Sequence, residues 1–175
     1  MKTKTSFART AGVFFLLLLC LSGCTKQRNT DIPEFCKRFN TVWGEQTLNP
    51  ENFFCEQAES AQDYNCHLQI ADNLTALLTL RTDTDGTVTA LQLTCIPERE
   101  TYTEDTFNAL YATYTALCAV LTVQDSDAAE NAVRTAGILP ESLGFSAHGF
   151  VGEAEKHRYS IFSGEQYLTL FCERI

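Results

Sequence analysis

The chain has 175 residues, with 13 basic and 22 acidic side chains and a formal net charge of −9. Three of the basic residues lie in residues 1–23, so the rest of the chain has 10 basic and 22 acidic residues and a net charge of −12. Nucleic acid and anionic lipid headgroups repel a protein this acidic, which excludes both as partners recruited by charge. Residues 31–175 are enough for one domain with a hydrophobic core.

Residues 1–23 have the layout of a secretory signal peptide. Lys2, Lys4 and Arg9 give a positively charged start, and the segment from Ala11 to Leu21 is almost wholly apolar. This apolar run is shorter than the ~20 residues that a helix needs to span a bilayer. We therefore expect the chain to be exported.

The segment Leu21-Ser22-Gly23-Cys24 places an aliphatic residue and two small residues before a cysteine. It resembles the lipobox of bacterial lipoproteins, in which small residues admit the signal peptidase and the cysteine carries a diacylglycerol. The resemblance implies that Cys24 becomes the acylated N-terminus, with palmitate among its acyl chains. These chains would anchor the protein to the cell membrane or, in a cell with two membranes, to the outer membrane. Plain secretion with cleavage elsewhere is the alternative.

Six cysteines remain after the signal peptide is removed and Cys24 is acylated. An even set in an exported protein predicts disulfides, and buried free thiols are the alternative. Cys55 and Cys66 flank a short helix-to-strand connection and form the predicted pair. Partners are left unassigned for the other four, which are Cys36, Cys95, Cys118 and Cys172.

Residues 24–30 form a short tether, and a helix is expected to begin directly after it. Asp31-Ile-Pro-Glu34 combines an acidic N-cap, a proline in the first turn and a glutamate three residues after the cap. Gly44 ends the pattern. The apolar residues between fall at spacings of 0, 3, 4, 7, 10 and 11, which is one face of a helix: Ile32, Phe35, Cys36, Phe39, Val42 and Trp43.

A second, shorter helix is predicted from the cap and first turn Asn49-Pro50-Glu51, and it would hold Phe53, Phe54 and Cys55. From Tyr64 onward the period changes to that of strands. An antiparallel meander is predicted with a hairpin turn at Asp83-Thr-Asp-Gly86, and its strands contain Leu68 and Ile70, Leu74 to Leu80, and Val88 to Cys95.

The second half repeats this order. Thr101-Tyr-Thr-Glu104 has the spacing of a capping box, and the apolar stripe that follows lies 75 residues after the first: Phe107, Leu110, Tyr111, Tyr114, Leu117 and Cys118. A helix from Ser126 to Ala136 comes next. Three strand-like segments follow it, around Phe145 to Val151, Arg158 to Phe162 and Gln166 to Cys172.

Both halves also end alike, since Leu91-x-Leu93-x-Cys95 and Leu168-x-Leu170-x-Cys172 are 77 residues apart. These agreements predict a tandem repeat, residues 31–97 and 101–175, of two helices and three antiparallel strands packed as one α+β body. The order of elements looks like the tandem-repeat fold of the secreted β-lactamase inhibitory proteins. A single unit looks like the small outer-membrane lipoprotein of the β-barrel assembly machine. This likeness concerns the fold and does not imply a function.

Patterns for catalysis and metal binding are weak. Gly144-Phe-Ser146-Ala-His148-Gly149 is one residue longer than a nucleophile elbow. Cys66 and His67 are adjacent, so on a strand they point to opposite faces and cannot ligate one metal ion together. We assign no catalytic residue and expect no metal or cofactor.

The final strand predicts a binding surface. If Leu168, Leu170 and Cys172 face the helices, then Tyr167 and Phe171 lie on the other face of the sheet, where the first half has small or polar residues. We expect Tyr159 to join them. The alternative is that the other half or the tail of the chain covers these side chains.

An aromatic patch of this kind is typical of surfaces that bind proteins, peptides or glycans. The sequence therefore favours a membrane-anchored, non-catalytic binding or envelope-assembly module that contacts an envelope protein, peptide or glycan. An envelope-associated hydrolase with a dispersed active site and a disulfide-based redox partner are the alternatives.

Overall fold

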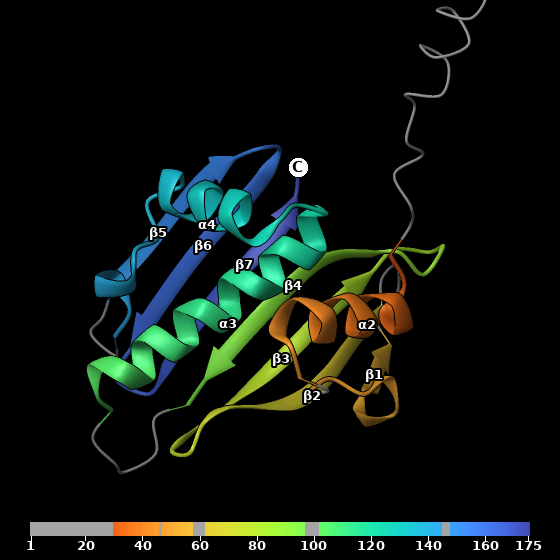
Figure 1. The fold of residues 1–175 in the computed structure, drawn as a ribbon, viewed down its shortest axis with the longest axis horizontal. Coiled ribbons are helices and arrows are strands. Elements are labelled where there is room, and N and C mark those ends of the chain that lie inside the picture. The colour runs from red at the N-terminus through yellow and green to blue at the C-terminus, as the bar shows by residue number, and fades with distance from the viewer. Residues whose placement is uncertain (1–29, 46, 58–61, 97–101, 145–147) are drawn as a thin grey trace, which may run out of the picture.

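The computed structural model describes residues 30–45, 47–57, 62–96, 102–144 and 148–175. Helices cover one face of an antiparallel seven-stranded sheet in these ranges, so the predicted α+β class is confirmed (Figure 1). The first half contains α2 (Ile32–Trp43), the 3₁₀ turn η1 (Pro50–Asn52), β1 (Phe54–Gln57), β2 (Gln62–Ala71), β3 (Leu74–Thr82) and β4 (Val88–Cys95). The second half contains α3 (Glu104–Thr122), α4 (Ser126–Thr135), η2 (Pro140–Ser142), β5 (His148–Ala154), β6 (His157–Gly164) and β7 (Tyr167–Arg174).

The strand order is β1-β2-β3-β4-β7-β6-β5, so β4 and β7 join the two halves edge to edge. Leu93 lies directly opposite Leu170, and Cys95 lies opposite Leu168. The two Leu-x-Leu-x-Cys segments thus pair with each other. Their central residues, Leu93 and Leu170, are 77 positions apart in the sequence and lie directly opposite each other. The halves also differ. The described part of the first half has four strands and that of the second has three, and the first half has the 3₁₀ turn η1 at the position where the second half has the helix α4. The duplication therefore stays a prediction.

The first predicted helix forms within its predicted limits. The Asp31 side chain accepts a hydrogen bond from the Glu34 amide at 2.9 Å. Gly44, at a φ of 85°, donates its amide to Asn40 and ends the helix, since a left-handed backbone favours glycine. Just before this helix, the Val88 amide donates to the Thr30 carbonyl at 2.8 Å, so the chain enters the domain beside the β3–β4 turn.

Two predicted helix starts are corrected. The cap of α3 is Thr103, whose side chain accepts from the Thr106 amide, whereas Thr101 lies outside the described residues. At Asn49 the predicted helix is wrong beyond its first turn, because η1 ends at Asn52 and Cys55 belongs to β1. Pairing of β1 with β2 supplies hydrogen-bond partners for the backbone of this segment. This tertiary contact overrides the helix-cap signal at Asn49.

The core lies between the helices and the sheet. Alternate residues of β3 and β4 point toward the helices and are buried, as the period of a half-covered strand requires. The largest fully buried side chains are Phe35, Phe39, Tyr114, Tyr159 and eight leucines. Burial of each such side chain contributes about 2 kcal/mol before conformational entropy is subtracted.

Helix α4 lies very close to β5 at one glycine. A Cβ atom added at Gly152 would lie 2.0 Å from the carbonyl oxygen of Ala136, at the end of α4. Backbone atoms cannot move aside as a flexible side chain can. Only glycine therefore lets α4 pack at this distance from β5.

Replacement of this glycine tests the packing. We expect Gly152→Ala to lower the free energy of unfolding by about 2 kcal/mol or more, measured by denaturant titration. Gly144→Ala is the matched control, since a Cβ atom there meets nothing within 4 Å. Equal stability of the two variants would contradict the close approach.

Candidate binding surface

The sheet face opposite the helices is not covered by any described element; we call it the open face. Figure 1 shows α2, α3 and α4 on the same side of the sheet. Because the halves join edge to edge, neither one covers the open face of the other. The predicted alternative, that the other half buries this face, is therefore wrong for the described residues.

Large hydrophobic side chains gather on one part of the open face. Tyr167 of β7 is 47% exposed and Phe162 of β6 is 45% exposed. Phe171 is half-buried on the same face, and Ile96, directly after β4, is 66% exposed. The β6–β7 register brings Phe162 and Tyr167 to neighbouring positions. We call these four residues, Ile96, Phe162, Tyr167 and Phe171, the apolar cluster.

Glycines shape the apolar cluster. A Cβ atom at Gly164 would lie 3.0 Å from the Tyr167 ring, and one at Gly149 would lie 3.2 Å from the Phe162 ring. Both glycines sit directly opposite or beside these aromatic residues in the strand register. The two rings therefore lie over bare backbone, and each aromatic side chain stays about half exposed.

Ion pairs occupy the opposite end of the open face. Arg81 of β3 lies 2.9 Å from Asp63 of β2, and this hydrogen bond lowers the pKa of the Asp63 carboxyl. Arg158 of β6 lies 3.0 Å from Glu173 and 3.2 Å from Glu153. We call these five residues the charged row, because they lie on one line across the strands, with Ala90 of β4 between Arg81 and Glu173.

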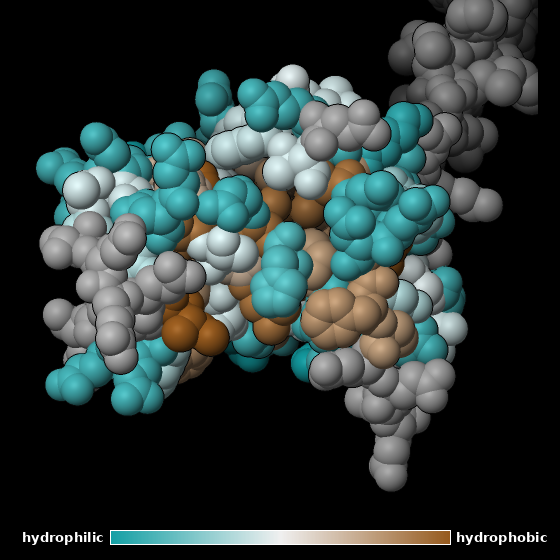
Figure 2. All heavy atoms as spheres, turned by 90° about the horizontal axis from the view of Figure 1, so that it is seen from below, coloured by the Kyte–Doolittle hydropathy of each residue, from teal (hydrophilic) through white to brown (hydrophobic). Residues whose placement is uncertain are grey.

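The apolar cluster and the charged row lie at different distances from the tether. The charged row is next to the β3–β4 turn, where Val88 bonds to Thr30. The apolar cluster lies up to six residues further along β4, roughly 20 Å away. Figure 2 shows the molecule from below the view of Figure 1, with hydrophobic residues reaching the surface among hydrophilic ones.

The predicted surface residues have different outcomes. Tyr167 and Phe171 lie on the open face, as expected. Tyr159 does not, because it is fully buried on the helix side opposite Cys172. Residues three apart on a strand point to opposite faces, so the buried Tyr159 places Phe162 on the open face. Alternation within β6 was the signal that could have identified Phe162.

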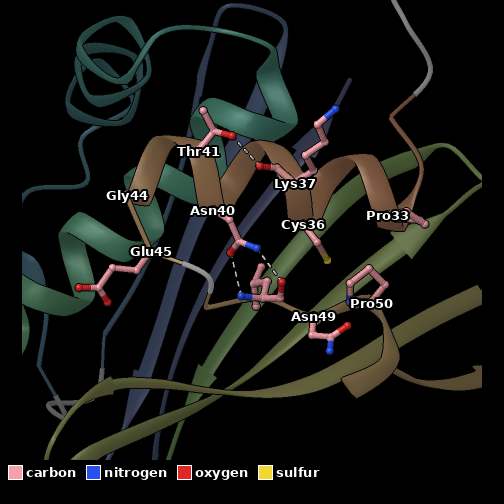
Figure 3. Close-up of a pocket in the computed structure, with 10 residues that line it drawn as sticks. Pro33, Cys36, Lys37, Asn40, Thr41, Gly44, Glu45, Asn49 and Pro50 are labelled. Carbon is pink, nitrogen blue, oxygen red and sulfur yellow. Dashed lines mark hydrogen bonds between the residues drawn. The ribbon is translucent and has the colours of Figure 1, made fainter.

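A pocket with a volume of about 700 Å³ lies beside α2 (Figure 3). Its central side chain, Asn40, donates to the Leu48 carbonyl at 2.8 Å and accepts from the amides of Thr47 and Leu48 at 3.0 and 2.8 Å. These bonds fix the segment after α2. The Asn40 amide group is therefore committed to the fold and does not define a ligand site.

The six described cysteines carry free thiols, so the predicted Cys55–Cys66 bridge is not formed in the structure. Cys55 is exposed on the edge strand β1, directly opposite Tyr64. Cys66 is buried, and its pKa is raised to about 12, mainly by burial and further by the nearby Cys36 thiol. The register of β1 thus separates the predicted partners, and Cys36 becomes the thiol neighbour of Cys66. Cys36, Cys95, Cys118 and Cys172 are all buried.

The weak catalytic candidates do not come together. Ser146 lies outside the described residues, and His148 begins β5 on an exposed edge. His157 is buried, and burial lowers its pKa. Its Nδ1 atom lies 2.8 Å from the Glu155 carbonyl oxygen. Among the described residues, no group of three or more His, Cys, Asp or Glu side chains could hold a metal ion.

The lipobox residues Leu21, Ser22, Gly23 and Cys24 lie outside the described ranges, so they rest on the sequence alone. No single helix within those ranges is long and apolar enough to cross a membrane, although α3 and α4, bent by 106°, reach that length and composition as a pair. A comparison with protein-family models, curated proteins and solved structures finds no match for the chain. The likeness in element order therefore stays a prediction.

Substitution of the two buried tyrosines Tyr114 and Tyr159 tests the placement of Tyr159. The Tyr114 hydroxyl donates to the Phe171 carbonyl at 2.8 Å, whereas the buried Tyr159 hydroxyl has no hydrogen-bond partner among the described residues. We expect Tyr114→Phe to lower the free energy of unfolding by about 1 kcal/mol. Tyr159→Phe should leave it unchanged or raise it by up to about 2 kcal/mol, because an unsatisfied hydroxyl is removed. Denaturant titration measures both, and an equal loss in the two variants would contradict this difference.

Proposed function

We propose that this chain is a membrane-anchored, non-catalytic binding module that uses the open face of its sheet to contact another envelope protein. The observation that carries the proposal is the apolar cluster on a sheet face that no described element covers. An antiparallel sheet commonly exposes one face, but that face is then polar. Several exposed large hydrophobic side chains side by side are typical of protein interaction sites.

The position of the apolar cluster favours a protein partner over the lipid surface. The acyl chains on Cys24 would hold the tether end of the domain at the membrane, and the charged row lies at that end. Acidic side chains are repelled by anionic headgroups. The apolar cluster extends from beside the charged row to roughly 20 Å further along the strands, where a protein in the envelope space could reach it.

The composition of the open face also fits a protein interface. Aromatic residues at the centre contribute most of the binding energy at such sites, and polar residues at the rim fix the orientation. Phe162 and Tyr167 supply the aromatic centre. The charged row supplies ion pairs at one border, and their partial exposure lets a partner align its own charges with them.

Removal of the aromatic rings tests the contact. Phe162→Ser with Tyr167→Ser should reduce capture of the partner from detergent-solubilised envelopes at least tenfold while changing the melting temperature little, because both rings are about half exposed. Val42→Ser with Val123→Ser is the matched control, since these exposed side chains belong to the helix side of the sheet. Equal loss of capture in both variants would contradict the assignment.

Site-specific cross-linking identifies the protein that binds the open face. A photo-reactive residue at Thr169, which lies directly opposite Phe162, should form an adduct with one envelope protein. The same residue at Thr41, on α2, should not. An adduct at position 169 with a second copy of this chain, or with lipid, would contradict the proposed partner.

Lipid anchoring has a separate test. We expect Cys24→Ala to abolish incorporation of labelled palmitate and to leave the signal peptide uncleaved, because both steps require the thiol. Cys20→Ala is the control and should be processed normally. Normal labelling of Cys24→Ala would exclude the lipobox.

A further inference from the structure

Two buried thiols lie where α3 packs on β7. Burial raises the pKa of Cys172, and the nearby Cys118 thiol raises it further. Neither residue has any exposed surface. Cys118 comes from the last part of α3 and Cys172 from the last part of β7, and they are far apart in sequence.

Neighbouring contacts hold the two thiols in place. One helical turn before Cys118, the Tyr114 hydroxyl donates to the carbonyl of Phe171, which directly precedes Cys172. Leu168, Leu170 and Cys172 alternate with less buried residues, so Cys172 points toward the helices. The fold thus aligns α3 and β7 independently of the thiols themselves.

We propose that Cys118 and Cys172 form a disulfide that fastens α3 to β7 when the chain folds in an oxidising compartment. This bond assigns two of the four cysteines whose partners the sequence leaves open. Both thiols lie between α3 and β7, so the bond needs their sulfur atoms to approach until the Cα atoms are about 4 to 7 Å apart.

The oxidant is a small-molecule or protein disulfide. The thiolate of one cysteine attacks a sulfur of the oxidant, which gives a mixed disulfide and releases one thiol. The second cysteine then attacks the protein sulfur of this mixed disulfide and releases the other thiol. The protein loses two protons and two electrons, and the oxidant is reduced to two thiols.

This exchange belongs to the folding reaction. In the folded chain neither thiol is accessible to an oxidant, and burial raises the pKa of Cys172, which suppresses the reactive thiolate. Oxidation therefore precedes or accompanies the packing of α3. The inference needs an oxidising compartment, which export would provide, and does not depend on the proposed binding function.

Peptide mapping tests the bond directly. The full-length chain is refolded in detergent in a mixture of oxidised and reduced glutathione, free thiols are alkylated, and the protein is digested without reduction. Mass spectrometry should find the Cys118 peptide linked to the Cys172 peptide. Cys95→Ala is the matched control, because Cys95 is equally buried in β4 and burial alone raises its pKa to about 12.

The cross-link should also stabilise the fold, because it closes a long loop in the unfolded chain. We expect the oxidised protein to melt about 10 °C above the reduced protein. This difference should vanish in Cys118→Ala and Cys172→Ala and persist in Cys95→Ala. A bond from Cys118 or Cys172 to any other cysteine, or free thiols at both positions in the refolded wild type, overturns the proposal whether or not the variants fold.

Discussion

The antiparallel pairing of β4 with β7 decides how the two halves of the chain meet. Their backbones join along six residue pairs centred on Leu93 and Leu170. Pairing through strand edges continues one sheet across both halves, so each half presents the same face to the helices. All helices consequently lie on one side (Figure 1), and the other face of the sheet has no cover from the described elements.

The open face depends on this arrangement and on the residues that line it. Glycines at 149 and 164 let the rings of Phe162 and Tyr167 lie against the backbone, which makes a low apolar surface instead of isolated protruding side chains. In the charged row, which lies near the tether, the acidic and basic side chains form ion pairs with one another. The two ends of the same face therefore differ in chemistry.

The helix side supports the open face from behind. The Tyr114 hydroxyl bonds α3 to the backbone of β7, and the buried Cys118 and Cys172 thiols lie about one helical turn away. Strand β7 carries Tyr167 and pairs with β6, which carries Phe162. Packing of α3 thus fixes the position of the hairpin that bears the aromatic rings. A bond between the two thiols would make that support covalent.

Short-range patterns in the sequence were sufficient for the bodies of α2, α3 and α4, the meander and the open-face position of Tyr167, because helix periodicity, hairpin turns and side-chain alternation are local. Tertiary structure alone decided that Asn49 starts only one turn, that the helices cover the face of β6 with Tyr159 and not the face with Phe162, and that Cys66 lies near Cys36 instead of Cys55. The physical reason is strand register. The register sets which neighbour a residue meets and which of its two faces is covered, and it depends on partners distant in the chain.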